Sequence, residues 1–221
     1  MQIEQLTIGY KSSAPIVTSI DAELLPGTFT CLLGRNGTGK STLLMTLAGQ
    51  LAPLDGHIIY NIEQQPALVL PKMPELTNTT VRELVAYGRL PYTGLFGKLK
   101  TSDYEMADKA IACMRITSLS DKYIHQISDG ERQKALIARG LAQGSDILLL
   151  DEPSAFLDYP SRLQLMEQLQ QLAHAENKTI LLSTHDVELA AKYADKLWII
   201  QDRHLIEENS QDFSATKYFA P

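Results

Sequence analysis

Near its N-terminus the chain reads Gly34-Arg35-Asn36-Gly37-Thr38-Gly39-Lys40-Ser41. The apolar run Thr30–Leu33 before this loop predicts a buried strand, and Ser41–Ala48 after it predicts a helix. Glycines between a strand and a helix let backbone N–H groups turn toward an anion, and the helix adds the positive end of its dipole. This context predicts a phosphate-binding loop in an α/β protein.

The residue types of the loop match the P-loop pattern, in which each type has its own task. Lys40 can reach the β- and γ-phosphates of ATP, and the Ser41 hydroxyl can ligate magnesium. We therefore predict ATP and Mg²⁺ as cofactors. The predicted nucleotide-binding residues of the loop are Gly34, Asn36, Gly37, Gly39, Lys40, Ser41 and Thr42. The simpler alternative, a glycine-rich turn followed by a chance Lys-Ser pair, leaves the fit of both flanks unexplained.

A second motif reads Ile147-Leu148-Leu149-Leu150-Asp151-Glu152-Pro153. The apolar run places two carboxylates at the carboxyl end of a buried strand, where α/β sheets bind ligands. Asp151 is the predicted magnesium ligand, directly or through water, and Glu152 would orient or deprotonate the attacking water. An apolar strand that ends in acids is common by itself, but beside a phosphate-binding loop it indicates hydrolysis of ATP.

Short apolar runs recur along the chain and suit strands that are buried on both faces, as in a parallel sheet. These runs are Thr30–Leu33, Ala67–Leu70, Ile147–Leu150, Ile180–Leu182 and Leu197–Ile200. Helical stretches separate most of them, which predicts an α/β fold with helices covering the sheet. The more polar segments Ile3–Ile8 and Ser19–Leu24 predict a small antiparallel β part.

Three capping boxes, in which Ser or Thr is followed three residues later by Glu, predict the starts of helices. They are Thr80–Glu83, Ser102–Glu105 and Ser128–Glu131. The predicted fold is an α/β P-loop NTPase with a mainly parallel sheet core, a small N-terminal antiparallel β part and a helical subdomain. We expect a single domain over residues 1–221, with about 1–74 and 146–221 as the catalytic core and about 75–145 as the helical subdomain.

The composition and the distribution of apolar residues limit which partners and which cellular compartment we expect for the chain. The net charge of −6 argues against a nucleic-acid partner, which favours a basic face. No apolar run approaches the roughly 20 residues of a membrane-spanning helix, and Met1–Tyr10 lacks the pattern of a signal peptide. We therefore expect a cytoplasmic protein. Cys31 and Cys113 are too few for a disulfide framework, and Cys31 lies in an apolar run where we expect it to pack.

Ile127-Ser128-Asp129-Gly130-Glu131-Arg132-Gln133 resembles the signature motif of ABC-type ATPases, usually written Leu-Ser-Gly-Gly-Gln. The resemblance implies that Ser128 and Gly130 bind the γ-phosphate of an ATP held by a second copy of the chain. The simpler interpretation is a capping box that starts a helix running to about Ala142, and both can hold because helix N-termini bind anions. Asp129 departs from the family's Gly, and an acid near phosphate is unfavourable unless its side chain points away.

Weaker matches to the same family follow in the expected order. Ser154–Asp158 resembles the D-loop, which crosses the dimer interface, and Ser183–Asp186 resembles the switch region, with His185 sensing the γ-phosphate. Tyr10 matches the aromatic residue that stacks on adenine. Each has a simpler alternative: an ordinary turn before a helix opened by Pro160, a structural histidine and a packed tyrosine.

One residue that the family usually has is missing. A Gln that contacts magnesium and the attacking water normally follows the strand that corresponds to Ala67–Leu70. The best equivalent here is Lys72, and a charged lysine cannot ligate a cation. We expect Lys72 either to contact phosphate directly or to leave the coupling to other residues. Gln64 and Gln65 lie before the strand and are badly placed to substitute.

The segment Thr80–Gly97 resembles ATPases of importers for iron–siderophore complexes, haem and cobalamin. Such importers pair two ATPase copies with two integral-membrane permease subunits and a substrate-binding protein. The resemblance implies a homodimer, peripheral on the cytoplasmic face of the cell membrane, with Tyr92, Leu95 and Phe96 in an exposed, turn-rich docking site for the permease. The simpler alternative for the segment is an amphipathic helix followed by a Gly/Pro-rich turn.

Two other functions stay open. The chain could be the ATPase of an exporter or lipid transporter, although the Gly88–Gly97 segment argues against this. It could also be a soluble scaffold ATPase, as in iron–sulfur assembly, or a DNA-repair ATPase. Repair ATPases usually carry a long coiled-coil or zinc insert between the P-loop and the signature motif, and this chain has none.

Overall fold

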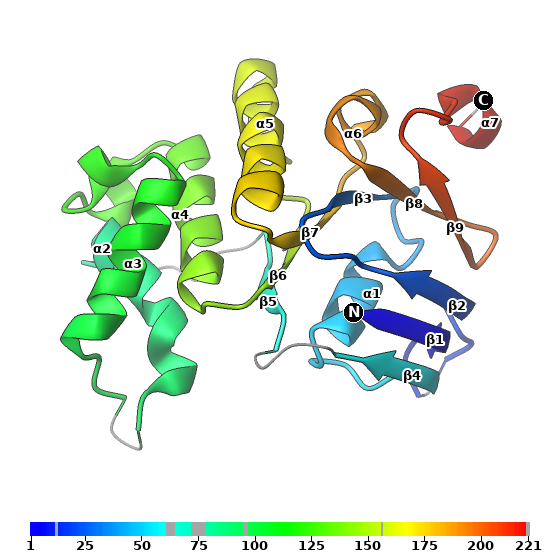
Figure 1. Ribbon diagram of the computed structural model, residues 1–221, viewed down its shortest axis with the longest axis horizontal. Helices are drawn as coiled ribbons and strands as arrows, with labels where there is room; N and C mark the ends of the chain where they lie inside the picture. Colours follow the sequence, from blue (N-terminus) through cyan, green and yellow to red (C-terminus); the bar gives the residue numbers. More distant parts are fainter. Residues whose placement is uncertain (12, 61–64, 72–77, 95–96, 156, 220–221) are drawn as a thin grey trace.

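The centre of the molecule is a six-stranded sheet with the strand order β5-β6-β7-β3-β8-β9 (Figure 1). Its strands are β3 (Phe29–Leu33), β5 (Ala67–Val69), β6 (Ile147–Asp151), β7 (Thr179–Ser183), β8 (Lys196–Gln201) and β9 (His204–Asn209). Neighbouring strands are parallel except for the β8–β9 pair. The computed structural model describes residues 1–11, 13–60, 65–71, 78–94, 97–155 and 157–219. The predicted mainly parallel core is confirmed.

A second sheet is antiparallel and has the order β2-β1-β4. It contains β1 (Gln2–Ile8), β2 (Val17–Glu23) and β4 (Asp55–Ile59). The first two strands were expected, whereas β4 and the edge strand β9 were not. Both have exposed or half-buried residues along their whole length. Strands of this kind have no run of apolar residues from which they could be predicted. They form because a neighbouring strand pairs with them, rather than because of their own sequence.

The side chains of β3 alternate between two apolar layers. Phe29, Cys31 and Leu33 face the layer that includes α5 (Tyr159–Ala175) and α6 (Val187–Tyr193). Leu32 faces the other layer, which includes α1 (Lys40–Leu47). Cys31 is fully buried, as expected, and burial raises the pKa of its thiol well above the usual range, so it acts as a packing residue.

Three α-helices lie beyond α5, on the far side from the antiparallel sheet (Figure 1). They are α2 (Val81–Ala86), α3 (Thr101–Cys113) and α4 (Asp129–Ala142), joined by the short 3₁₀ turns η1 (Tyr87–Tyr92), η2 (Thr117–Leu119) and η3 (Ile124–Gln126). This stretch is thus helical, as expected. The Thr80 and Ser128 capping boxes are confirmed.

The predicted capping box at Ser102–Glu105 is wrong. Helix α3 begins at Thr101, so Ser102 lies inside it rather than at its cap. The reason is a different carboxylate, because Asp103 accepts the Lys100 backbone N–H at 2.9 Å. Asp103 also accepts a bond from Arg89, which ties the start of α3 to the preceding segment. A search for Ser or Thr followed three residues later by Glu does not detect these contacts of Asp103.

The segment after α2 differs in part from the expected turn. The α-helix ends at Ala86, but the chain continues as a 3₁₀ helix through Tyr92, with Pro91 inside it. Gly88 is required there by close packing, because a Cβ atom would come within 2.2 Å of the carbonyl oxygen of Arg139 in α4. Tyr92 is 45% exposed and stacks under the Arg89 guanidinium, whereas Leu95 and Phe96 lie outside the described residues.

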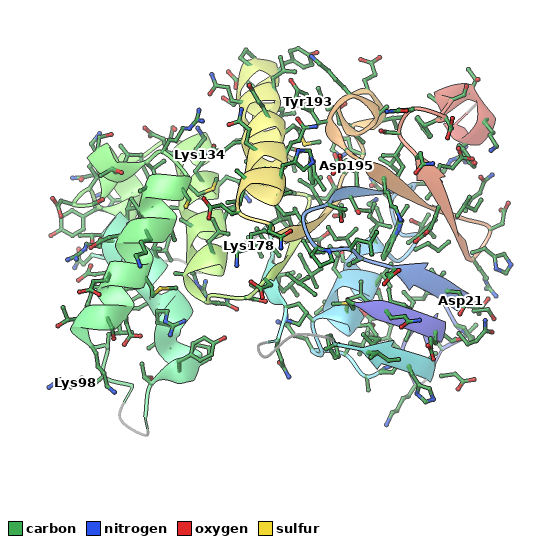
Figure 2. All side chains as sticks on the ribbon, viewed as in Figure 1. Asp21, Lys98, Lys134, Lys178, Tyr193 and Asp195 are labelled. Carbon is green, nitrogen blue, oxygen red and sulfur yellow. The ribbon has the colours of Figure 1, made fainter. Side chains whose placement is uncertain are left out.

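Asp195, which is labelled in Figure 2, links the central sheet to α5. Asp195 precedes β8, and its carboxylate accepts the backbone N–H of Phe29 at 2.8 Å and contacts His174 of α5 at 2.9 Å. A last short helix, α7 (Ala215–Phe219), follows β9. In the part of the chain that the structure describes, no helix is both long and apolar enough to cross a membrane.

Candidate active site

Three neighbouring strands of the central sheet bring the candidate residues to one edge. β6, β7 and β3 are adjacent and parallel, so their carboxyl ends lie at the same edge of the sheet. The glycine-rich loop follows β3, Asp151 ends β6 and is followed by Glu152, and His185 comes two residues after the end of β7. Segments more than a hundred residues apart in the sequence therefore converge at this edge.

The loop after β3 has the backbone of an anion-binding loop. Gly37 and Gly39 have positive φ angles of 80° and 104°. A Cβ atom on Gly39 would lie 2.5 Å from Cγ2 of Ile16, so both the angle and the space require glycine. No side chain caps α1. The first N–H groups of this helix are thus available for an anion.

Lys40 is 7% exposed and folds back over the loop. Its Nζ donates to the carbonyl oxygen of Gly34 at 2.9 Å and lies 3.6 Å from Oε1 of Glu152. The second oxygen of Glu152 is 2.9 Å from Nδ1 of His185. A carboxylate can only accept, so Nδ1 is the donor. Glu152 thus lies between an ammonium group and an imidazole.

The two acidic residues at the end of β6 have different environments. Asp151 is buried, and its Oδ1 accepts a hydrogen bond from Oγ of Ser183, with 2.7 Å between the two oxygens. Glu152 is half-buried and adopts a left-handed backbone with φ of 46°. That conformation costs a non-glycine residue roughly 1–2 kcal/mol, so the contacts around Glu152 must hold it there.

A cavity of about 240 Å³ opens between the loop and Glu152. It is lined by Ile16, Asn36, Gly37, Gly39, Lys40, Ser41, Thr42 and Glu152. Its donors are an ammonium group, hydroxyls and backbone N–H groups, which suit phosphate oxygens. Hydroxyl and carboxylate oxygens are the ligands that Mg²⁺ prefers. Ser41 and Glu152 line the cavity, whereas Asp151 is buried directly before Glu152 and is not among the lining residues. The residues present therefore fit a phosphate group together with a magnesium ion.

A slightly larger cavity of about 290 Å³ lies between β5 and α4. Its described lining is apolar or amide-bearing, with Arg139 as the charged group, and includes no hydroxyl or carboxylate. Those groups are needed to bind Mg²⁺. Size therefore does not identify the reactive centre, and the smaller cavity beside the glycine-rich loop is the candidate active site.

The comparisons with known proteins agree with this geometry. Residues 17–155 match the family model described as ABC transporter. The chain belongs to the ABC transporter family. As a member of this family it is an ATP hydrolase with the P-loop fold. A second model, described as an AAA domain, matches residues 121–191.

Curated relatives of this ABC protein include two ATP-binding proteins whose names refer to import or transport. Petrobactin import ATP-binding protein FpuD of Bacillus anthracis is 34% identical over 224 residues, which cover 96% of this chain and 81% of that protein. Ferric enterobactin transport ATP-binding protein FepC of Escherichia coli strain K12 is 34% identical over 218 residues, covering 94% and 80%. Among solved structures, an ABC transporter assigned to the metal-chelate type, in an inward-facing conformation, matches with a TM-score of 0.90 at 27% identity, covering 98% of this chain and 86% of that chain.

The predicted signature segment of this ABC protein, Ile127–Gln133, contributes no residue to the described lining of the cavity. Ser128 is the N-cap of α4, and its Oγ accepts the backbone N–H of Glu131 at 3.3 Å. Neither Ser128 nor Gly130 is among the residues that line the cavity. The Asp129 side chain is 70% exposed and pairs with Arg132 at 2.7 Å, so its charge is partly neutralised within the same helix turn. One chain therefore does not bring the predicted signature residues to its own phosphate loop.

Two residues of the site were missed by sequence reasoning. Ile16 lines the cavity and packs against Gly39, and Ser183 bonds to both acidic residues. Ile16 lies in an ordinary-looking stretch, whereas Ser183 is the first residue of the segment Ser183–Asp186 that resembles the switch region, in which only His185 was assigned a role. Tyr10 is 50% exposed and is not part of the cavity lining. Lys72 lies outside the described residues, as does Gln64, and Gln65 is exposed.

Proposed function

We propose that this chain is the ATP-binding and ATP-hydrolysing subunit of an ABC importer that takes up an iron chelate, such as a siderophore complex or haem, or cobalamin. The observation that carries the proposal is the convergence of Lys40, Asp151, Glu152 and His185 at one edge of the sheet. The iron-siderophore names of the relatives favour an importer over an exporter, a lipid transporter or a scaffold ATPase.

In the proposed reaction, water attacks the γ-phosphorus of ATP, the bond to the β–γ bridging oxygen breaks, and ADP and inorganic phosphate are released. Catalysis comes mainly from positioning and charge neutralisation. Lys40 exchanges its bond to the Gly34 carbonyl for phosphate oxygens, and the loop N–H groups bind the same anion. Ser41 and Asp151 would hold the magnesium ion, which neutralises phosphate charge when bound. Tyr10 would stack on the adenine.

Glu152 is the proposed residue that orients or deprotonates the water. Its two oxygens are engaged by Lys40 and His185. Transfer of Lys40 to the phosphates would free one carboxylate oxygen to accept a proton from water. His185 would keep the other oxygen oriented and is placed to sense the γ-phosphate. In this arrangement the Glu152 carboxylate would become available to water only when ATP draws Lys40 away from it.

We further propose that two copies of the chain close around two ATP molecules. Each site would use the phosphate loop of one copy and Ser128 and Gly130 of the other, because these residues are apart within one chain. Asp158 and its neighbours would cross that interface as the D-loop. The expected partners are two permease subunits and, through them, a substrate-binding protein, with no nucleic acid because the net charge is −6.

The permease would position the homodimer on the cytoplasmic face of the membrane. The helical subdomain, about residues 75–145, is the proposed docking unit, and residues 1–74 and 146–221 form the proposed catalytic core. Tyr92 is our candidate contact because it is half exposed on that subdomain. Phe96 stays a prediction from the sequence.

The test of the function is transport. The chain should copurify with a detergent-solubilised permease, and a strain that lacks the chain should lose uptake of one labelled cargo among ferric siderophores, haem and cobalamin. Glu152→Gln should fail to restore that uptake, whereas the wild-type chain should restore it. Unchanged uptake of all three cargo classes, or copurification with a soluble scaffold alone, would overturn the importer assignment.

A further inference from the structure

The hydroxyl of Ser183 joins the two acidic residues of the site. Ser183 is the last residue of β7, has no exposed surface, and lies opposite Asp151 in the parallel β6–β7 pair. Its Oγ is 2.7 Å from Oδ1 of Asp151 and 3.0 Å from the backbone nitrogen of Glu152. One side chain from the neighbouring strand thus contacts both acids.

Chemistry fixes the direction of these two hydrogen bonds. A backbone N–H can only donate, so the Ser183 oxygen must accept from Glu152. The single hydroxyl proton is then free for Asp151, whose ionised carboxylate can only accept. The hydroxyl therefore has a donor role toward one acid and an acceptor role toward the other, and no other side-chain type of this size does both equally well.

Packing alone does not explain a serine at this position. The preceding residues of β7, Ile180, Leu181 and Leu182, are apolar and fully buried. An alanine would fill a similar volume without any polar group to satisfy, whereas a buried hydroxyl is unfavourable unless it is hydrogen-bonded. The described partners of this hydroxyl are both in the acidic pair.

We propose that Ser183 is a positioning residue that sets the metal-binding carboxylate of Asp151 and the reactive carboxylate of Glu152 with one hydroxyl. The inference rests on the roles proposed above for the two acids. By engaging Oδ1 of Asp151, Ser183 orients that carboxylate and leaves its other oxygen for a magnesium ion. The Glu152 N–H is shared between the Ser183 hydroxyl at 3.0 Å and the Ser183 backbone carbonyl at 3.2 Å. The hydroxyl is thus a second acceptor that supports the left-handed backbone, which directs the Glu152 side chain toward Lys40 and His185.

The backbone that carries this hydroxyl continues into Thr184 and His185, the segment that resembles the switch region. His185 follows Ser183 by two residues, and the backbone N–H of Thr184 donates to Leu32 of β3 at 3.1 Å. The end of β7 is thereby tied to β6 on one side and to β3 on the other. A displacement of β7 at this point would alter Asp151, Glu152 and His185 together.

The experiment compares Ser183→Ala, Ser183→Thr and the matched control Ser145→Ala. Ser145 is also a buried serine that accepts a backbone N–H, but it precedes β6 at the opposite end of the strand. For each variant, ATP affinity is measured by calorimetry with EDTA and with Mg²⁺, ATP turnover is measured against Mg²⁺ concentration, and a thermal melt checks folding.

Ser183→Ala should leave ATP affinity in EDTA unchanged. It should raise the Mg²⁺ concentration for half-maximal turnover by about tenfold, in keeping with the loss of one hydrogen bond to a charged group, and it should lower the maximal rate. It should also reduce the gain in ATP affinity on adding Mg²⁺. Ser183→Thr keeps the hydroxyl and should restore the Mg²⁺ dependence, and Ser145→Ala should match the wild type.

Three results would overturn the inference. The first is a Ser183→Ala protein with the wild-type Mg²⁺ midpoint and turnover. The second is equal impairment in Ser183→Ala and Ser183→Thr, which would indicate a packing role. The third is a Mg²⁺ defect of the same size in Ser145→Ala. A wild-type chain that neither binds ATP nor hydrolyses it would instead refute the proposed function and the inference with it.

Discussion

The two parts of the proposed ATP site are held in opposite ways. At the edge of the sheet, Lys40, Asp151, Glu152 and His185 are fixed by contacts between segments that are far apart in the sequence. At the start of α4, Ser128 is fixed by a capping box that spans three residues. The first part depends on the whole fold, whereas the second is a local structure that any chain with this helix start could form.

The two parts also differ in how far their side chains are exposed to solvent. Asp151 is buried and Glu152 is half-buried, so their charges act through little water. Ser128 and Asp129 are exposed, and solvent screens the Asp129–Arg132 pair. The contrast suggests a preformed catalytic half and an open half that becomes functional when a second chain covers it. Four experiments test this contrast, in order of decreasing expected effect.

The largest expected effect is that of Glu152→Gln on turnover. The amide cannot accept a proton from water, and removal of a general base typically lowers rates by about 10²–10⁴-fold. ATP binding should persist, and the protein should accumulate as an ATP-bound dimer in sedimentation. Near-normal turnover in this variant would remove Glu152 from its proposed role.

Lys40→Ala should weaken binding itself. Charge-assisted hydrogen bonds of this kind contribute roughly 1.5–3 kcal/mol, or about 10- to 150-fold in affinity. Titration with ATP measures this loss, and turnover should vanish at ordinary ATP concentrations. A thermal melt is the control, because Lys40 also bonds to the Gly34 carbonyl. An unchanged ATP affinity would contradict the assignment.

Substitutions at Ser128 distinguish its role as the N-cap of α4 from its proposed contact with the ATP bound by the second chain. Ser128→Asp keeps an N-cap acceptor, so the melting temperature should hold, but the added charge opposes the partner's phosphate and should lower turnover by at least about tenfold. Ser128→Ala should instead destabilise the protein by about 1 kcal/mol through loss of the cap. If Ser128→Asp hydrolyses ATP normally, the residue is only a cap.

The smallest expected effect is the pH dependence of the α4 cap. The backbone N–H and hydroxyl of Ser128 hold the pKa of Glu131 below its usual value of 4.5. Because the folded-state pKa is lowered, the ionised form stabilises the fold above the unfolded-state pKa, and this contribution is lost as the pH falls through the folded-state value. Glu131→Gln keeps a hydrogen-bond acceptor but removes the charge. Comparison with the wild type therefore isolates the contribution of the Glu131 charge to the unfolding free energy.

At pH 7 the wild type should exceed Glu131→Gln in unfolding free energy by about 0.3–1 kcal/mol, the usual range for an acid at a helix N-terminus. The gap should close as the pH falls below 4.5. Denaturant titrations of both proteins at several pH values measure it. A gap that is constant with pH would show that the charge of Glu131 does not stabilise the cap.

The sequence by itself determined the features that depend on neighbouring residues. The strands β3, β6, β7 and β8, the glycine-rich loop and the starts of α2 and α4 all follow from patterns of a few residues, because local backbone bonds and burial on both faces select them. The start of α3 was misplaced because Asp103 and Arg89, outside the Ser/Thr–Glu pattern, decide it.

Only the tertiary structure decided the strand pairings and the contacts between motifs. β4 and β9 exist because another strand pairs with them, and their own residues are too polar to predict this. The meeting of Glu152 with Lys40 and His185, and the bonds of Ser183 to both acids, depend on the order in which parallel strands lie in the sheet. That order reflects packing over long sequence distances, which no short pattern encodes.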